Sequence, residues 1–140
     1  MTITEFSLRL LSAAFAGMLI GFERQWNNKS AGIRTNTLVA IGAALYVLLS
    51  FKLNNEGEGI TRIIGQVVTG IGFLGAGIIF KEGINVRGLT TAATVWCSAA
   101  IGCLSAAGYY IEAFIGTVII LLVNLVLKPI HKWLFNRNKP

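Results

Sequence analysis

The sequence contains no aspartate, one histidine, two cysteines and two prolines. Its 140 residues include only six acidic side chains, all of them glutamates, against twelve Lys and Arg, so that charged residues make up 13% of the chain. Soluble domains carry about 25% charged residues, so this content is low. Because 54% of the residues are hydrophobic and the charges fall in short gaps, the composition indicates one compact membrane domain.

The scarcity of reactive side chains excludes several functional classes. His131 stands alone in a basic segment, so no Ser–His–Asp or Cys–His arrangement is available, and no phosphate-binding P-loop is visible. Cys97 and Cys103 lie six residues apart on different sides of one apolar helix. They can neither bridge each other there nor form a metal site, and we interpret them as small core residues. We expect no enzyme activity, no resident cofactor and no nucleic-acid partner.

Five apolar segments are long enough to cross a bilayer, which needs about 20 helical residues. They are residues 6–22, 37–51, 63–80, 89–107 and 111–127. The first apolar run continues to Phe22, so we interpret it as a membrane span and not as a cleaved signal peptide. The fourth segment is expected to be the most enclosed by protein. The fold prediction is an all-α polytopic bundle of about five transmembrane helices over residues 1–130, followed by a short basic cytoplasmic tail over 131–140.

Lysine and arginine are unevenly distributed between the two sides of the predicted bundle. Nine lie on one side and three on the other: Arg24, Lys29, Arg34, Lys81, Arg87, Lys128, Lys132, Arg137 and Lys139 against Arg9, Lys52 and Arg62. Cytoplasmic loops carry the excess of these residues. The pattern predicts a cytoplasmic C-terminus and an external N-terminus. Trp26 and Trp133 agree as inner-interface residues, and Tyr109 and Tyr110 as outer-interface residues.

Small residues recur in two segments, where they indicate close helix packing. They are Gly17 and Gly21 in the first segment and Gly70, Gly72, Gly75 and Gly77 in the third. On a helical wheel Gly72 and Gly75 share one face of the third segment, and Gly70 and Gly77 share the opposite face. Two small faces predict that this segment is the central helix, packed on both sides. A passage or a sliding interface is the alternative interpretation of the same residues.

Polar residues in the third and fourth segments predict a polar interior. Its candidates are Arg62, Gln66, Thr69, Thr94 and Ser98. Arg62 could instead extend to the outer surface, whereas Gln66 lies deeper and needs a partner.

A charged cluster is predicted at the inner surface, formed by Glu23, Arg24, Arg34, Glu82 and Arg87. Two of these arginines stand just before helix starts, which Thr35, Asn36, Thr37, Thr90 and Thr91 could cap. Helix N-termini beside an arginine favour an anion such as phosphate or a lipid headgroup. Ion pairs of Glu23 or Glu82 with an arginine are the alternative.

A magnesium path finds little support in the carboxylates of this sequence. Mg²⁺ binds through one or two carboxylates together with water, and no predicted span has a central Glu. A path lined by hydroxyls and carbonyls is left open. The residues assign no metal site, and Glu23 is the carboxylate that we name as a candidate ligand.

Four motifs in this order and spacing resemble the MgtC/SapB family of bacterial inner-membrane proteins. They are GFERQ at 21–25, AGIRTNTLV at 31–39, GIGFLGAGIIF at 70–80 and VRGLTTAATVW at 86–96. The resemblance implies a five-helix membrane domain. It also implies a role in growth at low magnesium, in survival of pathogens inside host cells, and in modulating partner membrane proteins such as ATP synthase or phosphate uptake systems. Longer members continue into a cytoplasmic ACT-like domain, and the motifs found here belong to the membrane domain.

Two functions are consistent with the residues and with the resemblance. The first is a non-enzymatic regulator of the bacterial inner membrane that acts by helix–helix contact with other membrane proteins. The small-residue faces of the helices also suggest a homodimer. The alternative is a transporter or channel for magnesium or another ion, since the family is also described in those terms.

Overall fold

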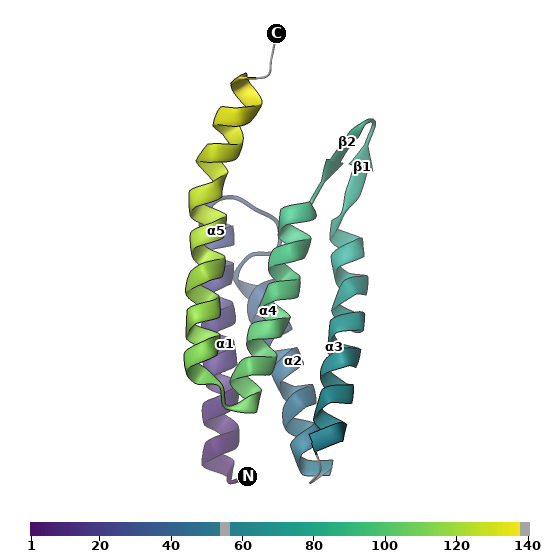
Figure 1. Cartoon of the computed structure of the whole chain (residues 1–140), viewed down its shortest axis with the longest axis vertical. Helices are drawn as coiled ribbons and strands as arrows, with labels where there is room; N and C mark the ends of the chain where they lie inside the picture. The colour runs from purple at the N-terminus through teal and green to yellow at the C-terminus, as the bar shows by residue number, and fades with distance from the viewer. Residues whose placement is uncertain (54–56, 138–140) are drawn as a thin grey trace.

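The computed structural model describes residues 1–53 and 57–137, with side chains described for 1–53 and 59–129. Figure 1 shows five helices that alternate in direction, with one short hairpin. The elements are α1 (Ile3–Trp26), α2 (Ile33–Leu53), α3 (Gly57–Ile78), β1 (Phe80–Glu82), β2 (Asn85–Arg87), α4 (Leu89–Ala107) and α5 (Tyr110–Arg137). All five helices are long and apolar enough to cross a membrane, which confirms the predicted class.

The two ends of the bundle differ in what they carry. The α1–α2 connection, the β1–β2 hairpin and the C-terminal end of α5 lie together at one end, which we call the hairpin end (Figure 1). The N-terminus lies at the opposite end. That the hairpin end faces the cytoplasm stays a prediction from the distribution of Lys and Arg.

Helix boundaries differ from the prediction where local chemistry extends them. The Thr2 hydroxyl accepts a hydrogen bond from the Glu5 amide at 3.1 Å, and the Glu5 carboxylate accepts one from the Thr2 amide at 2.8 Å. This capping box starts α1 at Ile3 and not at residue 6. The last predicted span ends at residue 127, whereas α5 continues through Pro129 to Arg137. A proline removes one backbone donor but keeps a helical φ, so it bends a helix without always ending it.

The predicted basic tail can be compared with the structure only in part. The side chains of His131, Lys132, Trp133, Arg137 and Lys139 lie outside the described residues, and so does the expected placement of Trp133 at the inner interface.

A two-stranded antiparallel hairpin occupies the loop between the third and fourth spans. Glu82 pairs with Asn85, so Gly83 and Ile84 form the turn. Gly83 has φ +63°, which favours glycine at the first turn position. Gly88 has φ +88°, and a Cβ there would overlap the Ile78 carbonyl, so the base of the hairpin is held tightly between α3 and α4.

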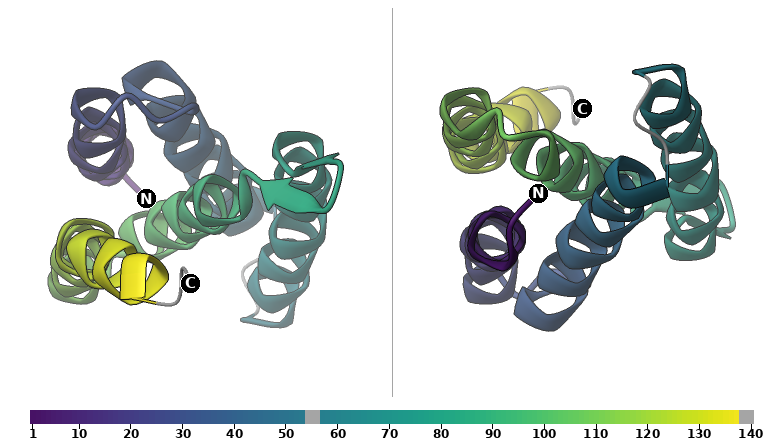
Figure 2. Two further views of the ribbon diagram at one scale, coloured as in Figure 1. Left: turned by 90° about the horizontal axis from the view of Figure 1, so that it is seen from above. Right: turned by 90° about the horizontal axis from the view of Figure 1, so that it is seen from below.

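Helix α4 is the centre of the bundle, and it packs against all four other helices (Figure 2). In the membrane-spanning windows, 61% of the α4 residues are buried, compared with 6% of those in α3. This confirms that the fourth segment is the most enclosed. The core around it consists largely of alanines with Val47, Leu48 and Val95.

The prediction that the third segment is central is wrong. Helix α3 lies at one edge of the bundle and packs mainly against α4 and α2 (Figure 2). Its larger apolar residues make these contacts, and they are Ile60, Ile64, Val67 and Ile71. A Cβ added at Gly70, Gly72 or Gly77 would meet nothing within 4 Å, and one at Gly75 would only touch the Ala92 side chain at 3.8 Å. The branched apolar side chains of α3, and not its glycines, fix how it packs within the chain.

Candidate functional site

Buried and half-buried polar side chains gather toward the hairpin end, where α1, α2, α4 and α5 meet. We call them the polar cluster: Glu23, Arg24, Asn27, Asn36, Thr91, Thr94, Ser98, Asn124 and Lys128. Polar groups out of contact with water are costly unless they are hydrogen-bonded, so their partners define the site.

Arg24 ties α1 to the start of α4. It is 3% exposed, and its Nη2 donates a hydrogen bond to the Thr91 hydroxyl at 2.7 Å. Its Nε is buried and has no hydrogen-bond acceptor among the described residues. A guanidinium in this position holds two helices together through one strong bond and retains a donor for a water molecule or ligand.

Glu23 connects α1 to α5 through an amide. It is 7% exposed, and its Oε1 accepts a hydrogen bond from Asn27 Nδ2 at 2.8 Å. The side-chain Oδ1 of Asn27 in turn accepts a hydrogen bond from the Lys128 ammonium. Glu23 Oε2 is buried and has no donor among the residues that the structure describes. The carboxylate is therefore compensated by Lys128 through Asn27, and one of its oxygens is left available.

Asn36 fastens the first turn of α2 to the middle of α4. It is fully buried; its Nδ2 donates to the Gly32 carbonyl at 3.1 Å, and its Oδ1 accepts from the Ser98 hydroxyl at 2.8 Å. A second bond from Nδ2 reaches the Ala31 carbonyl. Asn36 thus donates hydrogen bonds, from inside the bundle, to two backbone carbonyls of the α1–α2 connection.

The hydroxyls of α4 are mostly bonded within the chain. Thr94 donates to the Thr90 carbonyl at 2.8 Å and lies 3.5 Å from both polar atoms of the Asn124 amide. Ser98 bonds to Asn36 as described, while Ser105 is buried without a partner in the described part of the chain. These hydroxyls follow one side of α4 and are packed, not open.

The expected helix caps are not formed. The N-cap of α4 is Gly88, which has no side chain to offer, so Thr90 is exposed in the first turn and Thr91 accepts from Arg24. Helix α2 begins at Ile33, so Thr35 and Asn36 lie within its first turns and not ahead of it. Thr37 is partly buried, and its hydroxyl has no partner among the described residues.

The predicted charged cluster is divided between two places. Glu23 and Arg24 are buried in the polar cluster. Arg87 and Glu82 pair with each other across the hairpin, with Nε and Oε2 3.2 Å apart and both side chains about two-thirds exposed. Arg34 is exposed at the start of α2. Of the two ion pairs considered for Arg87, the structure contains the one with Glu82.

The predicted polar interior is divided in the same way. Thr94 and Ser98 are buried, whereas Arg62, Gln66 and Thr69 lie on the exposed surface of α3. Thr69 bonds to the Gly65 carbonyl of its own helix at 3.0 Å. Because α3 is peripheral, its polar stripe cannot line the same interior as the stripe of α4.

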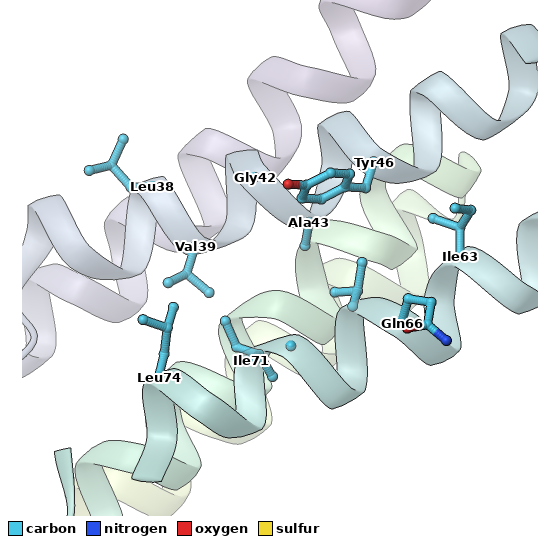
Figure 3. A pocket seen from close by; sticks show the side chains of 11 residues that line it. Leu38, Val39, Gly42, Ala43, Tyr46, Ile63, Gln66, Ile71 and Leu74 are labelled. Atoms are coloured by element: carbon cyan, nitrogen blue, oxygen red, sulfur yellow. The ribbon is translucent and has the colours of Figure 1, made fainter. Parts of the chain in front are cut away.

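Two cavities lie outside the polar cluster. The larger, about 590 Å³, is a groove between α2 and α3 that is lined by Gly42, Tyr46, Gln66, Gly70 and Leu74, among others (Figure 3). The smaller, about 170 Å³, lies between α1, α4 and α5, and its lining includes Ser12, Ser105, Tyr110 and Thr117. Thr94 and Ser98 line neither of these cavities.

The described side chains do not bring three metal-ligand residues together. Among them, no group of three His, Cys, Asp or Glu lies close enough to hold a metal ion. Glu23 is accompanied in the polar cluster by amides, hydroxyls and two cations, which suits hydrogen bonding better than divalent-metal coordination.

Sequence reasoning did not place Asn27, Asn124 or Lys128 in a functional site. Two signals could have found them. Asn27 lies four residues after Glu23, which places both on one helix face. Asn124 and Lys128 have the same spacing in an otherwise apolar span, where an amide needs a partner within the bundle.

Comparison with protein-family models identifies the family to which the chain belongs. The MgtC family model matches residues 10–133, which include every residue of the polar cluster. The chain belongs to the MgtC family. It is therefore a multi-pass membrane protein of a bacterial inner-membrane family whose members are not enzymes.

Curated relatives agree with this family. The chain is 56% identical over 121 residues to "Protein MgtC" of Brucella abortus, covering 86% of this chain and 50% of that protein. It is 52% identical over 128 residues to "Protein MgtC" of Salmonella typhimurium, covering 91% and 54%. An uncharacterized protein of Synechocystis is 50% identical over 130 residues, covering 93% and 55%. The chain thus spans about half the length of these relatives. No solved structure gives a significant match.

Proposed function

We propose that the chain is a non-enzymatic inner-membrane regulator, linked to growth in low magnesium and to intracellular survival, which acts by modulating partner membrane proteins such as ATP synthase or a phosphate uptake system. The observation that supports this is the β1–β2 hairpin. It extends beyond the bundle, and every residue of its two strands is exposed.

The hairpin combines an apolar tip with charges of both signs. Ile84 is 95% exposed at the turn, and Phe80 and Val86 are each about half exposed. Lys81, Glu82 and Arg87 surround them, and they too are exposed. An apolar anchor with a charged rim is the composition of protein–protein contact sites. The polar cluster beneath it would hold the helices rigid, so that the hairpin is presented in one position.

This proposal is tested by removing the anchor without touching the fold. Ile84→Ser should abolish growth support in low-magnesium medium while leaving protein level and unfolding unchanged, since Ile84 packs on almost nothing. The matched control is Ile111→Ser, which alters a 73% exposed isoleucine on α5 at the other end of the bundle. Normal growth with Ile84→Ser would remove the hairpin from the mechanism.

The proposal also needs the hairpin in the cytoplasm. A cysteine introduced at Ile84 should be labelled by a membrane-impermeant maleimide in inside-out vesicles and protected in intact spheroplasts. A cysteine at Tyr109 should show the reverse. Labelling of Ile84→Cys from the outside would overturn both the predicted orientation and the proposed contact with cytoplasmic parts of partners.

A second function, transport of magnesium or another ion, is favoured by one observation. Buried hydroxyls of Thr91, Thr94, Ser98 and Ser105 follow α4 along most of its length. Mg²⁺ flux into proteoliposomes, read by an internal dye against empty liposomes, decides between the two functions. Saturable flux that falls in Thr94→Val would make transport the main function, and no flux from folded, inserted protein would reject it.

A further inference from the structure

The two faces of the β1–β2 hairpin carry different charges. Cross-strand partners lie on the same face of a strand pair, and successive residues alternate between faces. The register places Lys81 directly opposite Val86 on one face, which we call the cationic face. Glu82 and Arg87 lie on the other face, where they form their ion pair. One face is therefore neutralised within the hairpin, and the other exposes an ammonium group beside an apolar side chain.

Lys81 has no carboxylate partner within the described part of the chain. The hairpin end has two glutamates among the described residues: Glu82 pairs with Arg87, and Glu23 is buried and bonded to Asn27. In the sequence, residues 113–140 include lysine and arginine but no acidic side chain. A positive charge exposed on a projecting hairpin attracts an anionic partner.

The length of the hairpin distinguishes a protein partner from the membrane surface. The 20-residue span of α3 that ends at Ile78 is about 30 Å long, which is the thickness of the hydrocarbon core. Ile84 lies six residues farther along, a reach of about 20 Å in extended chain, and the hairpin continues away from the bundle (Figure 1). The headgroup layer on each side is only about 5–8 Å thick. The tip of the hairpin therefore extends past the lipid headgroups into water.

The other exposed cations at this end lie closer to the membrane. Lys29 and Arg34 belong to the α1–α2 connection and the start of α2, which do not extend as far as the hairpin (Figure 1). Trp26, at the end of α1, is 76% exposed, as is typical of a tryptophan at the membrane–water interface. Lipid phosphates can neutralise these two cations, whereas the hairpin holds the exposed side chain of Ile84 where no lipid covers it.

We propose that the cationic face of the hairpin binds an acidic segment of another protein outside the bilayer, with a carboxylate against Lys81 and an apolar side chain against Val86 and Ile84. This inference rests on the proposed function, because it names the partner of the same hairpin. A second copy of this chain does not fit, since its hairpin end carries the same excess of cations. The ion pair with Glu82 occupies Arg87, so the acidic segment is directed to one face, and releasing Arg87 would offer it the wrong face.

Charge-reversal variants test the sign of the partner. Lys81→Glu should reduce growth support in low-magnesium medium as strongly as Ile84→Ser, and Lys81→Arg, which keeps the charge, should preserve it. The matched control is Arg34→Glu, which makes the same change in charge at an exposed position of the same end, and it should grow nearly normally. Protein level is measured for each variant. Equal losses with Lys81→Glu and Arg34→Glu would attribute the effect to net charge at the membrane surface and would contradict the proposal.

The same assay separates this inference from the function on which it rests. Normal growth with Lys81→Glu, together with loss of growth in Ile84→Ser, would reject an acidic partner and retain the contact at the hairpin. Normal growth with both variants would reject the proposed function itself.

Photocross-linking in native membranes identifies what covers the cationic face. A benzophenone amino acid in place of Val86 should cross-link to a protein segment that has Asp or Glu beside the linked position. Lys81→Glu should lower the yield about threefold to tenfold, because it replaces an attraction by a repulsion of similar size. Lysine in place of the partner's acidic residue should restore the yield. Cross-links to phospholipid, to a second copy or to a segment without acidic residues, or no cross-link at all, would overturn the proposal.

A fluorescent label tests the position of the tip without any partner. In a Cys97→Ala and Cys103→Ala background, Ile84→Cys is labelled with a polarity-sensitive dye, and the protein is placed in vesicles of phosphatidylcholine with or without phosphatidylglycerol. The emission should be that of a dye in water in both kinds of vesicle. A shift to shorter wavelength in the vesicles that contain phosphatidylglycerol would show that the hairpin binds anionic lipid, and it would overturn the proposal.

Discussion

Helices α4 and α3 lie side by side in one bundle, and their glycines serve different purposes. A Cβ at Gly102 of α4 would overlap the Ala40 carbonyl, so α4 and α2 can meet only because that position is bare. A Cβ at Gly72 of α3 would meet nothing. The comparison teaches that a membrane helix needs glycine for a close approach at some positions and not at others, and that the sequence alone does not tell which.

The polar side chains of the two helices differ in the same way. On α4, Thr91 and Ser98 accept or donate bonds that tie it to α1 and α2. On α3, Gln66 has no partner among the described residues. One helix is completed by bonds within its own chain, and the other carries a polar side chain that has no such bond among the described residues.

The largest expected effect follows from adding a side chain where α1 meets α2. A Cβ at Gly21 would lie 2.6 Å from the Ile33 Cα, so Gly21→Leu forces two backbones apart. We expect a loss of at least about 3 kcal/mol in the free energy of unfolding, and little folded protein. Folded yield in detergent measures this. Gly65→Leu on α3 is the control, and a folded Gly21→Leu protein would contradict the conclusion that α1 and α2 need a bare position where they meet.

A smaller effect is expected from the bond that joins α1 to α4. Arg24→Leu leaves the buried Thr91 hydroxyl without its donor, which should lower the free energy of unfolding by about 1–3 kcal/mol. Because the two residues share one bond, Thr91→Val added to Arg24→Leu should cost less than the sum of the single changes. Denaturant titration of all four proteins tests this, and full additivity would show that the bond contributes nothing.

The bond between α2 and α4 should contribute somewhat less. Ser98→Ala removes the donor to Asn36 Oδ1, and we expect a loss of about 1 kcal/mol, because the Asn36 amide keeps its two bonds to backbone carbonyls. Thermal unfolding in detergent measures the loss. Thr90→Ala, at an exposed position of the same helix, should leave unfolding unchanged, and equal effects of both changes would contradict the assigned role of Ser98.

The smallest effect on stability is expected at the hairpin. Glu82 and Arg87 are both about two-thirds exposed, so their ion pair should contribute less than about 1 kcal/mol. Glu82→Gln should leave thermal unfolding nearly unchanged. If the hairpin contacts a partner, the same variant should reduce growth support in low magnesium. A large loss of stability would instead make the pair a structural clamp.

Much of the fold could be predicted from the sequence, because membrane spans follow from long apolar segments alone. The five spans and the enclosed position of the fourth were predicted in this way. Boundaries were less accurate, since the capping box at Thr2 and the hairpin turn at Gly83 depend on local bonds. The order of packing was harder still, because glycines suggested a central α3 while its isoleucines set its actual place.

The candidate site was predictable only in parts. Glu23 and Arg24 were named because charges are costly near a membrane, but Lys128 joins the cluster only through its contact with Asn27, which lies 101 residues away in sequence. The sequence left Glu23 and Glu82 open as partners of Arg87, and the structure contains the pair with Glu82. In the hairpin Glu82 lies opposite Asn85 and Arg87 lies opposite Phe80, so the two charged side chains meet diagonally across the strand pair, which sequence spacing alone does not reveal.

The most direct test compares alanine at two glycines in neighbouring helices. Gly102→Ala should lower the free energy of unfolding by roughly 1–3 kcal/mol, because its methyl group meets the Ala40 carbonyl. Gly72→Ala, measured in monomeric detergent-solubilised protein, should not lower the free energy of unfolding. It should raise it by as much as about 1 kcal/mol, because alanine has the higher helix propensity. That result would show that Gly102 is required for packing within the chain and that Gly72 is not. Equal losses at both positions would contradict it and would place the neighbour of Gly72 within the fold.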